Sequence, residues 1–186
     1  ELFLYAIAAL LRRECFSAVG YLLRQHYYVD MNARQGKDPM VSFAEFRQHL
    51  DSLEHRNKRL KLRRLSLHAD ILNKRSTHGA LTFSQVMQAD FVLFIRDCLD
   101  SIRTGRWQHW WPMTLIYSER HYGPFEIFAR SQSARYFEKT KTIFDITTKE
   151  DFLPLAEAFK TEKLRIPRWE FHTFNPFELM AYDKLS

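Results

Sequence analysis

Glycine, proline and cysteine are all scarce in this 186-residue chain, which has 5, 6 and 2 of them. Few glycines and prolines disfavour loop-rich and all-β folds and favour long regular elements. Every glycine is isolated, so the sequence lacks the glycine-rich loops that bind phosphates and dinucleotides. The Gly-x-Ser-x-Gly turn of serine hydrolases is absent as well. We therefore expect no nucleotide site and no cofactor, and the chain is more consistent with a binding protein than with an enzyme.

The two cysteines, Cys15 and Cys98, cannot build a disulfide framework, and their apolar neighbours predict buried thiols. Such sparse cysteine usage is typical of a reducing compartment, so we expect a cytoplasmic protein. No Cys-x-x-Cys or His-x-x-x-His pair is present, and no acidic residue stands two positions before a lysine. The first two spacings are typical of zinc sites and the third of restriction-type nucleases. The sequence therefore predicts no metal site.

Long apolar runs are also missing. The run Leu2–Leu11 has ten residues, whereas a helix that spans a membrane needs about 20. Arg12 and Arg13 follow this run, whereas a signal peptide carries its positive charge before the apolar segment. We therefore expect a buried helix here and no membrane partner. Because the chain starts with Glu1 and not with methionine, we expect it to be a fragment of a longer protein.

Hydrophobic residues make up 46% of the chain and include 16 phenylalanines, which is enough to build a core. The predicted fold is a single, mostly α domain over residues 1–186. Ser42 followed by Glu45 is the pattern of a capping box, and no glycine or proline follows before Gly79. This pattern predicts one long central helix over about 43–75.

Thr82 followed by Gln85 predicts a second capping box, which opens a buried helix over about 83–103. The expected core residues of this helix are Phe91, Phe94, Ile95, Cys98 and Leu99. Further helices are expected over 2–14, 17–28, 124–144, 149–162 and 176–184. At most one or two short strands are expected, near 113–117 and 166–171.

Positive charge is concentrated in one segment. Residues 55–75 carry eight Lys or Arg and one Asp, a net charge of +7, whereas the whole chain carries +6. A basic helix attracts anionic partners such as nucleic acid, although it can also be a solvated helix with surface ion pairs. The candidate nucleic-acid-binding residues are Arg56, Lys58, Arg59, Lys61, Arg63 and Arg64.

An aromatic connector follows the buried helix, with Trp107, Trp110 and Trp111 close to Arg106. Exposed tryptophans beside an arginine can stack on bases. Alternatively, the same side chains can anchor the connector on the helices by burying their large apolar surface.

The spacing of one arginine and one histidine offers a catalytic hypothesis. Arg103 and His109, with five residues between them, resemble the pair that ribonucleases of the HEPN family use, in which the histidine acts on the ribose hydroxyl. Two further pairs with similar spacing are Arg63 with His68 and Arg165 with His172. Roughly two such pairs are expected by chance, so Arg103 and His109 are weak catalytic candidates.

Three functions are compatible with this sequence. The first is a non-enzymatic module of a larger intracellular protein, which mediates regulation, homo-oligomerisation or contact with a protein partner. The chain resembles helical tail domains of bacterial proteins, some of them concerned with phage defence; no particular motif carries this resemblance, which implies a module of a bacterial defence protein. The second is nucleic-acid binding along residues 55–75, and the third is a HEPN-like ribonuclease. Whether the basic residues converge on one exposed surface distinguishes the first two.

Overall fold

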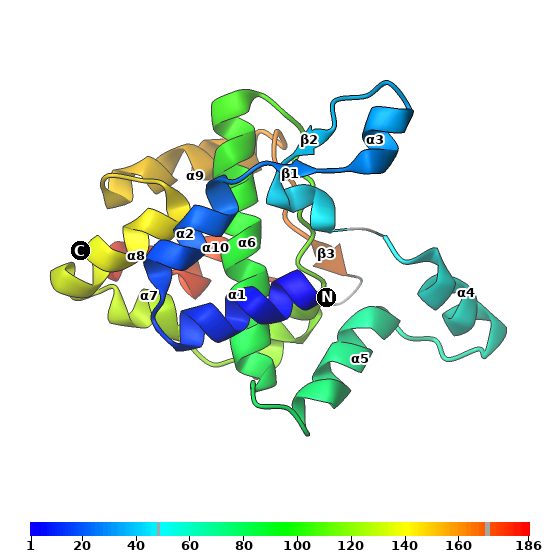
Figure 1. Cartoon of the computed structure of the whole chain (residues 1–186). Coiled ribbons are helices and arrows are strands. Elements are labelled where there is room, and N and C mark those ends of the chain that lie inside the picture. The colour runs from blue at the N-terminus through cyan, green and yellow to red at the C-terminus, as the bar shows by residue number, and fades with distance from the viewer. Residues whose placement is uncertain (48, 170–171) are drawn as a thin grey trace.

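The computed structural model describes residues 1–47, 49–169 and 172–186, and this part of the chain is mostly helical (Figure 1). The α-helices are α1 (Leu2–Arg12), α2 (Phe16–Arg24), α3 (Asp30–Arg34), α4 (Asp51–Arg59), α5 (Leu67–Ser76), α6 (Phe83–Thr104), α7 (Glu126–Arg130), α8 (Ala134–Phe144), α9 (Leu153–Lys160) and α10 (Pro176–Leu179). The 3-10 helices are η1 (Phe43–Phe46), η2 (Met113–Arg120), η3 (Lys149–Phe152) and η4 (Tyr182–Lys184). Two antiparallel hairpins pair β1 (Tyr27–Tyr28) with β2 (Met40–Val41), and β3 (Arg168–Trp169) with β4 (His172–Thr173). The mostly α fold class is confirmed.

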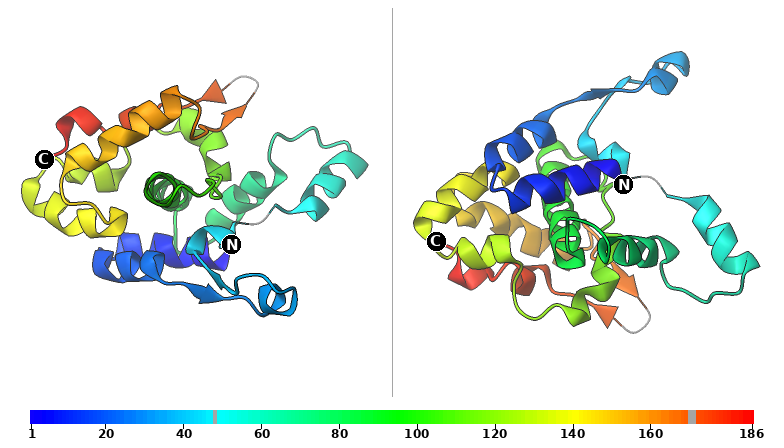
Figure 2. Two further views of the ribbon diagram at one scale, coloured as in Figure 1. Left: turned by 90° about the horizontal axis from the view of Figure 1, so that it is seen from above. Right: turned by 60° about the horizontal axis from the view of Figure 1, so that its bottom comes forward.

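Helix α6 lies at the centre of the molecule, and most of the other helices surround it, whereas α3 and α4 project outward (Figures 1 and 2). The predicted capping box is present, because the Thr82 hydroxyl accepts from the Gln85 amide and the Gln85 side chain accepts from the Thr82 amide. The helix ends at Gly105, whose φ of 71° is in the left-handed region that glycine adopts without strain. The five predicted core residues of α6 are at most 3% exposed. The prediction of a buried helix over 83–103 is confirmed.

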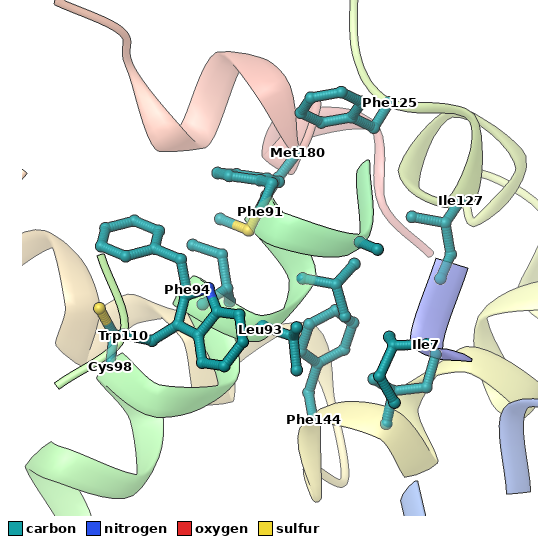
Figure 3. Packing of buried hydrophobic residues seen from close by; sticks show 14 of the residues in the cluster. Ile7, Phe91, Leu93, Phe94, Cys98, Trp110, Phe125, Ile127, Phe144 and Met180 are labelled. Carbon is teal, nitrogen blue, oxygen red and sulfur yellow. The ribbon is translucent and has the colours of Figure 1, made fainter. Parts of the chain in front are cut away.

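Phenylalanine rings fill the space around α6 (Figure 3). The ring of Phe91 contacts those of Phe125 and Phe128, with centroids 5.3 and 5.7 Å apart. The ring of Phe94 stacks on that of Phe159 at 6.1 Å. Rings from α7, α9 and the segment before α7 thus meet on one helix. Offset and edge-to-face pairs of this kind add stability beyond the apolar area that they bury.

Helix α2 packs closely on α8. A Cβ atom on Gly20 would lie 2.5 Å from the carbonyl oxygen of Thr142, so this approach requires glycine. Nη1 of Arg24 donates to the same carbonyl at 3.3 Å. The helices predicted over 2–14 and 17–28 are present as α1 and α2, although α2 ends at Arg24 and the chain continues into β1.

The predicted long helix over 43–75 is wrong, because this segment forms η1, α4 and α5 with turns between them. The expected capping box does not form at its start. The carboxylate of Glu45 lies 3.2 Å from Nδ1 of His109, and the Ser42 side chain makes no capping hydrogen bond. The chain therefore makes one short 3-10 turn and leaves it at Arg47.

Charge and a second cap interrupt the helix further on. In a continuous helix, Arg59 and Arg63 would lie four residues apart on one face, where like charges repel. The interruption instead leaves a turn after α4. Ser66 then starts α5, because its hydroxyl accepts from the Ala69 amide at 3.1 Å.

Other expectations are corrected in the connectors. Residues 113–117 belong to η2 and form no strand, since the amide and hydroxyl of Thr114 both donate to Asp90 and fix a turn. The strand expected near 166–171 overlaps β3, although positions 170 and 171 lie outside the described residues. The hairpin of β1 and β2 was not predicted, so the described residues contain four strands where at most two were expected. Cys98 is buried as predicted, but Cys15 lies in the exposed turn between α1 and α2.

Candidate nucleic-acid interface

Residues 51–65, which we call the basic arm, project from the helices that surround α6 (Figures 1 and 2). The arm consists of α4 and the turn that follows it. None of the nine described residues of α4 is buried. The segment 47–82, which contains the arm, has no Phe, Tyr or Trp. The arm is therefore a polar projection that contributes little to the core.

Five of the six predicted nucleic-acid-binding side chains lie free on this arm. Arg56, Lys58, Arg59, Lys61 and Arg63 are all exposed, and none forms an ion pair or a side-chain hydrogen bond with another described residue. They fall within eight consecutive positions at the end of α4 and in the turn. The structure therefore brings five unpaired positive charges together at the outer end of a projection.

The turn has a defined geometry. The amides of Lys61 and Leu62 donate to the carbonyl oxygens of Lys58 and Asn57 at 3.1 and 3.0 Å, which is the Schellman arrangement at a helix C-terminus. Lys61 has a φ of 50°, although it is not glycine. The side chain of Asn57 then bonds the backbone of Arg64 twice, at 2.7 and 3.1 Å. These bonds hold the turn and its cations in one arrangement.

The sixth predicted residue, Arg64, has a structural role. Its guanidinium forms an ion pair with the carboxylate of Asp70, which also accepts a hydrogen bond from the Tyr117 hydroxyl. Partial burial alone would raise the pKa of Asp70, but the hydrogen bonds from Arg64 and Tyr117 outweigh it and keep the pKa below its ordinary value. Arg64 thus fastens the base of the arm to α5 and η2.

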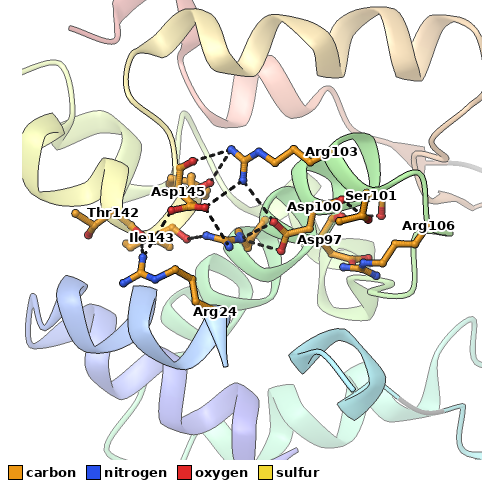
Figure 4. A network of polar contacts seen from close by, with 12 residues as sticks. Arg24, Asp97, Asp100, Ser101, Arg103, Arg106, Thr142, Ile143 and Asp145 are labelled. Atoms are coloured by element: carbon orange, nitrogen blue, oxygen red, sulfur yellow. Dashed lines mark hydrogen bonds and ion pairs between the residues drawn. The ribbon is translucent and has the colours of Figure 1, made fainter. Parts of the chain in front are cut away.

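The weak catalytic candidates have different partners. Nη2 of Arg103 donates to the carbonyl oxygens of Phe144 and Asp145 at 3.3 and 2.7 Å, within a network on the α8 side of α6 (Figure 4). His109 instead lies beside Glu45. No contact between described residues joins the two side chains, and the ribonuclease function stays a prediction.

The alternative Arg–His pairs gain no support either. Arg63 is on the basic arm and exposed, whereas His68 packs below it with 12% of its side chain exposed. The side chain of His172 lies outside the described part of the structure.

Two buried aspartates hold the aromatic connector, and sequence reasoning missed them. Asp97 is fully buried and accepts from Nη2 of Arg106 at 2.6 Å and from the amides of His109 and Trp110, both at 2.7 Å. Asp90 accepts from Nε1 of Trp110 at 2.8 Å. The signal in the sequence was the position of the two aspartates on either side of the apolar run Phe91–Ile95. Trp110 is buried and therefore anchors the connector on α6, which is one of the two roles considered above for the tryptophans.

The remaining tryptophans differ from Trp110 in exposure. Trp107 is 81% exposed, whereas Trp111 is partly buried. Among the three tryptophans, Trp107 alone is exposed enough to stack on a base. Trp107 follows α6 and is not part of the basic arm.

Comparisons of the chain with protein-family models, curated proteins and solved structures found no match. Among the described residues, no three or more His, Cys, Asp or Glu side chains are grouped so that they could hold a metal ion. None of the helices in the described part of the chain has the length and apolar character needed to cross a membrane.

Proposed function

We propose that this protein binds nucleic acid through the basic arm, by contacts of its lysines and arginines with backbone phosphates. The observation that carries the proposal is the group of five exposed cations without a carboxylate partner at positions 56–63. Neutralising phosphates releases counterions from the nucleic acid, and this release supplies most of the affinity of sequence-independent binding. A lysine or arginine without a carboxylate partner can contact a phosphate without first breaking an ion pair.

The composition of the arm favours a duplex over a single strand. Proteins that bind single strands combine positive charge with aromatic rings on which bases stack. Residues 47–82 contain no Phe, Tyr or Trp. A duplex presents regularly spaced phosphates outside and needs no stacking platform.

An acidic protein partner is the alternative occupant of the same surface. It corresponds to the interaction module that the sequence also predicts. Leu60, Leu62 and Leu65 are exposed between the cations, with 48%, 40% and 56% of their surface accessible. Apolar contacts of this kind are typical of protein interfaces, so the experiment must separate the two partners.

The experiment measures fluorescence anisotropy with labelled duplex DNA, duplex RNA and an acidic polyglutamate peptide over a series of salt concentrations. We expect duplex binding whose log–log slope against salt is about −4 to −5, since each phosphate that is neutralised contributes about −0.9. The arm variant replaces Arg56, Lys58, Arg59, Lys61 and Arg63 with Gln and should abolish that slope. Its matched control replaces Arg13, Lys37, Arg135, Lys139 and Lys160, which are exposed and unpaired among the described residues, with Gln.

Both variants lower the net charge by five, so they separate the arm from the overall charge. Equal losses in the two variants would show that the arm has no special role. Absence of duplex binding at low salt would also contradict the proposal. A basic surface attracts any polyanion, so the comparison of affinities decides between the two partners. Tighter binding of polyglutamate than of either duplex would contradict the proposal and favour the acidic protein partner.

A further inference from the structure

A cavity of about 390 Å³ lies between the basic arm and the rest of the protein. Its outer wall comes from α4 and the following turn, with Leu53 and Leu65 among the lining residues. Its inner wall includes Arg47, His68 and Trp111. Small-molecule sites usually have volumes of about 300–1,000 Å³, apolar walls and a few polar groups that converge. This cavity has a volume in that range, and its wall is mixed, because apolar side chains from the arm and the connector alternate with polar ones that include His49, Glu54 and His109.

Arg47 is the only Lys or Arg among the described residues that line the cavity. Its Nε donates to the carbonyl oxygen of Trp111 at 2.7 Å, and its Nη1 lies 3.4 Å from Nδ1 of His68. A guanidinium has five N–H donors, so these contacts leave three without a partner among the described residues. Burial lowers the pKa of Arg47 below its ordinary value. A cation that has lost water and has no direct counterion is a site for an anion.

The charge of the buried Asp90 raises the pKa of Arg47 against the larger effect of burial, but Asp90 forms no ion pair or hydrogen bond with it. Both oxygens of Asp90 are occupied, because Oδ1 accepts from Trp110 and Oδ2 accepts from the amide and hydroxyl of Thr114. No ion pair joins Arg47 to any other described residue. The positive charge at the inner wall is therefore available to a ligand.

The charge balance selects a monoanion. Burial and the charge of Arg47 lower the pKa of His68 and outweigh the opposite effects of Asp90 and of Glu1, whose Oε1 lies 3.3 Å from Nε2 of His68. The neutral ring therefore predominates at neutral pH. Glu54 lines the cavity on the arm side, with its Oε1 3.6 Å from Nε2 of His49, and its negative charge disfavours a doubly charged ligand more than a singly charged one. One planar guanidinium matches one carboxylate, whose two oxygens can accept parallel hydrogen bonds.

The remaining wall is suited to an apolar chain. Leu50, Leu53 and Leu65 contribute from the arm, and Trp111 and Met113 contribute from the connector. Leu50 and Leu65 are 37% and 56% exposed, so a ligand in the cavity would remove apolar surface from water.

We propose that this cavity binds a small organic monocarboxylate with an apolar chain, whose carboxylate contacts Arg47 and whose chain packs against the leucines of the arm. The inference does not depend on nucleic-acid binding, because the cavity lies below the arm and the five free cations lie on its outer end.

Isothermal titration calorimetry with decanoate, decanol and decyl phosphate tests the proposal. The three probes share one chain and differ in the head group. We expect decanoate to bind at least about tenfold more tightly than decanol, which corresponds to about 1.4 kcal/mol. Decyl phosphate should bind less tightly than decanoate near neutral pH, because its second charge lacks a partner. Tighter binding of decyl phosphate would overturn the choice of a carboxylate.

Variants show whether binding occurs in the cavity. Arg47→Gln should remove the preference for decanoate over decanol, while Arg34→Gln on exposed α3 should retain it. Leu53→Trp fills the cavity and keeps Arg47, so it should weaken the binding of decanoate and decanol alike. This variant also decides the question if Arg47→Gln does not fold.

The arm variant is the control for general electrostatic attraction. It should bind decanoate as the unchanged protein does, whether or not the duplex experiment succeeds. Loss of decanoate binding in the arm variant but not in Leu53→Trp would contradict the cavity site. Equal affinities for decanoate and decanol, or absence of decanoate binding up to its solubility limit, would contradict it as well.

Discussion

At the scale of single residues, buried polar groups position the connector after α6. Asp97 is inaccessible to water and satisfies one guanidinium and two backbone amides at once. Removing it would leave Arg106 without its counterion and two amides without an acceptor. Unpaired buried groups cost more than the net value of the bonds that they lose.

We therefore expect Asp97→Ala to lower the free energy of unfolding by about 3–5 kcal/mol. Urea denaturation followed by circular dichroism measures the change. The matched control is Asp183→Asn, an exposed aspartate, which should change stability by less than about 0.5 kcal/mol. A loss below about 1 kcal/mol for Asp97→Ala would mean that water replaces the carboxylate in this site.

Two partly buried histidines make stability depend on pH. Burial lowers the pKa of both His68 and His121 from the ordinary value of 6.5. The His121 ring stacks on Phe125 at 4.4 Å, and its Nε2 is buried without a hydrogen-bond partner. Below about pH 6.5 the unfolded chain binds protons that the folded protein does not, so stability falls as the pH falls.

We expect stability to be highest above pH 6.5 and to decrease between about pH 6.5 and 5.5, by at most about 1.4 kcal/mol per pH unit for each histidine. Replacing His121 with Phe should reduce this dependence, as measured by urea denaturation at several pH values. His26→Phe changes an exposed histidine and should retain the dependence. Identical pH profiles for the two variants would show that His121 does not contribute.

At the scale of secondary-structure elements, local capping signals predicted α6 well and the segment 43–75 poorly. Thr82 and Gln85 cap each other, whereas Glu45 bonds His109, which is 64 positions away in the sequence. A local pattern cannot reveal a distant competitor for the same carboxylate. The sequence did not reveal the turn at Lys61 either, because the residue with the left-handed conformation is a lysine and not the glycine that usually marks such a turn.

The turn at Lys61 gives a prediction for the element. Because φ is 50° at this position, Lys61→Gly should raise the free energy of unfolding of the arm by about 0.5–1 kcal/mol. Amide hydrogen exchange of α4 measures this local stability. Arg59→Gly is the matched control, since Arg59 is in the last helical turn of α4 and the change should lower stability by about 1 kcal/mol. Effects of the same sign in both variants would contradict this account of the turn.

At the scale of the whole molecule, the sequence predicted where the charged segment lies, but it predicted only in part what the residues of this segment contact. Summing charges along the sequence identified the candidate residues, five of which are free and exposed. The ion pair of Arg64 with Asp70 and the cavity below the arm depend on how α4, α5 and the connector meet. Neither follows from spacing, because each joins segments whose relative placement is set by the tertiary fold.

The final prediction follows from the position of the basic arm outside the hydrophobic core. Residues 49–63 contain five Lys or Arg and two Asp or Glu, so replacing them with a short Gly-Ser linker lowers the net charge from +6 to +3. The change retains Arg64 with its partner Asp70. Because α4 contains no buried residue, we expect the shortened protein to fold cooperatively, with a loss of no more than about 3 kcal/mol.

Urea denaturation and near-ultraviolet circular dichroism measure the fold of the shortened protein, and the anisotropy and calorimetry assays measure its binding. Duplex and decanoate binding should both be lost while the aromatic signal of the core persists, because the phenylalanines around α6 receive no contribution from α4. Control proteins with Gly-Ser linkers of two lengths show whether strain in the connection affects stability. Loss of cooperative unfolding with both linkers would mean that the arm is part of the folding unit. Retention of duplex binding would place the nucleic-acid surface elsewhere on the molecule.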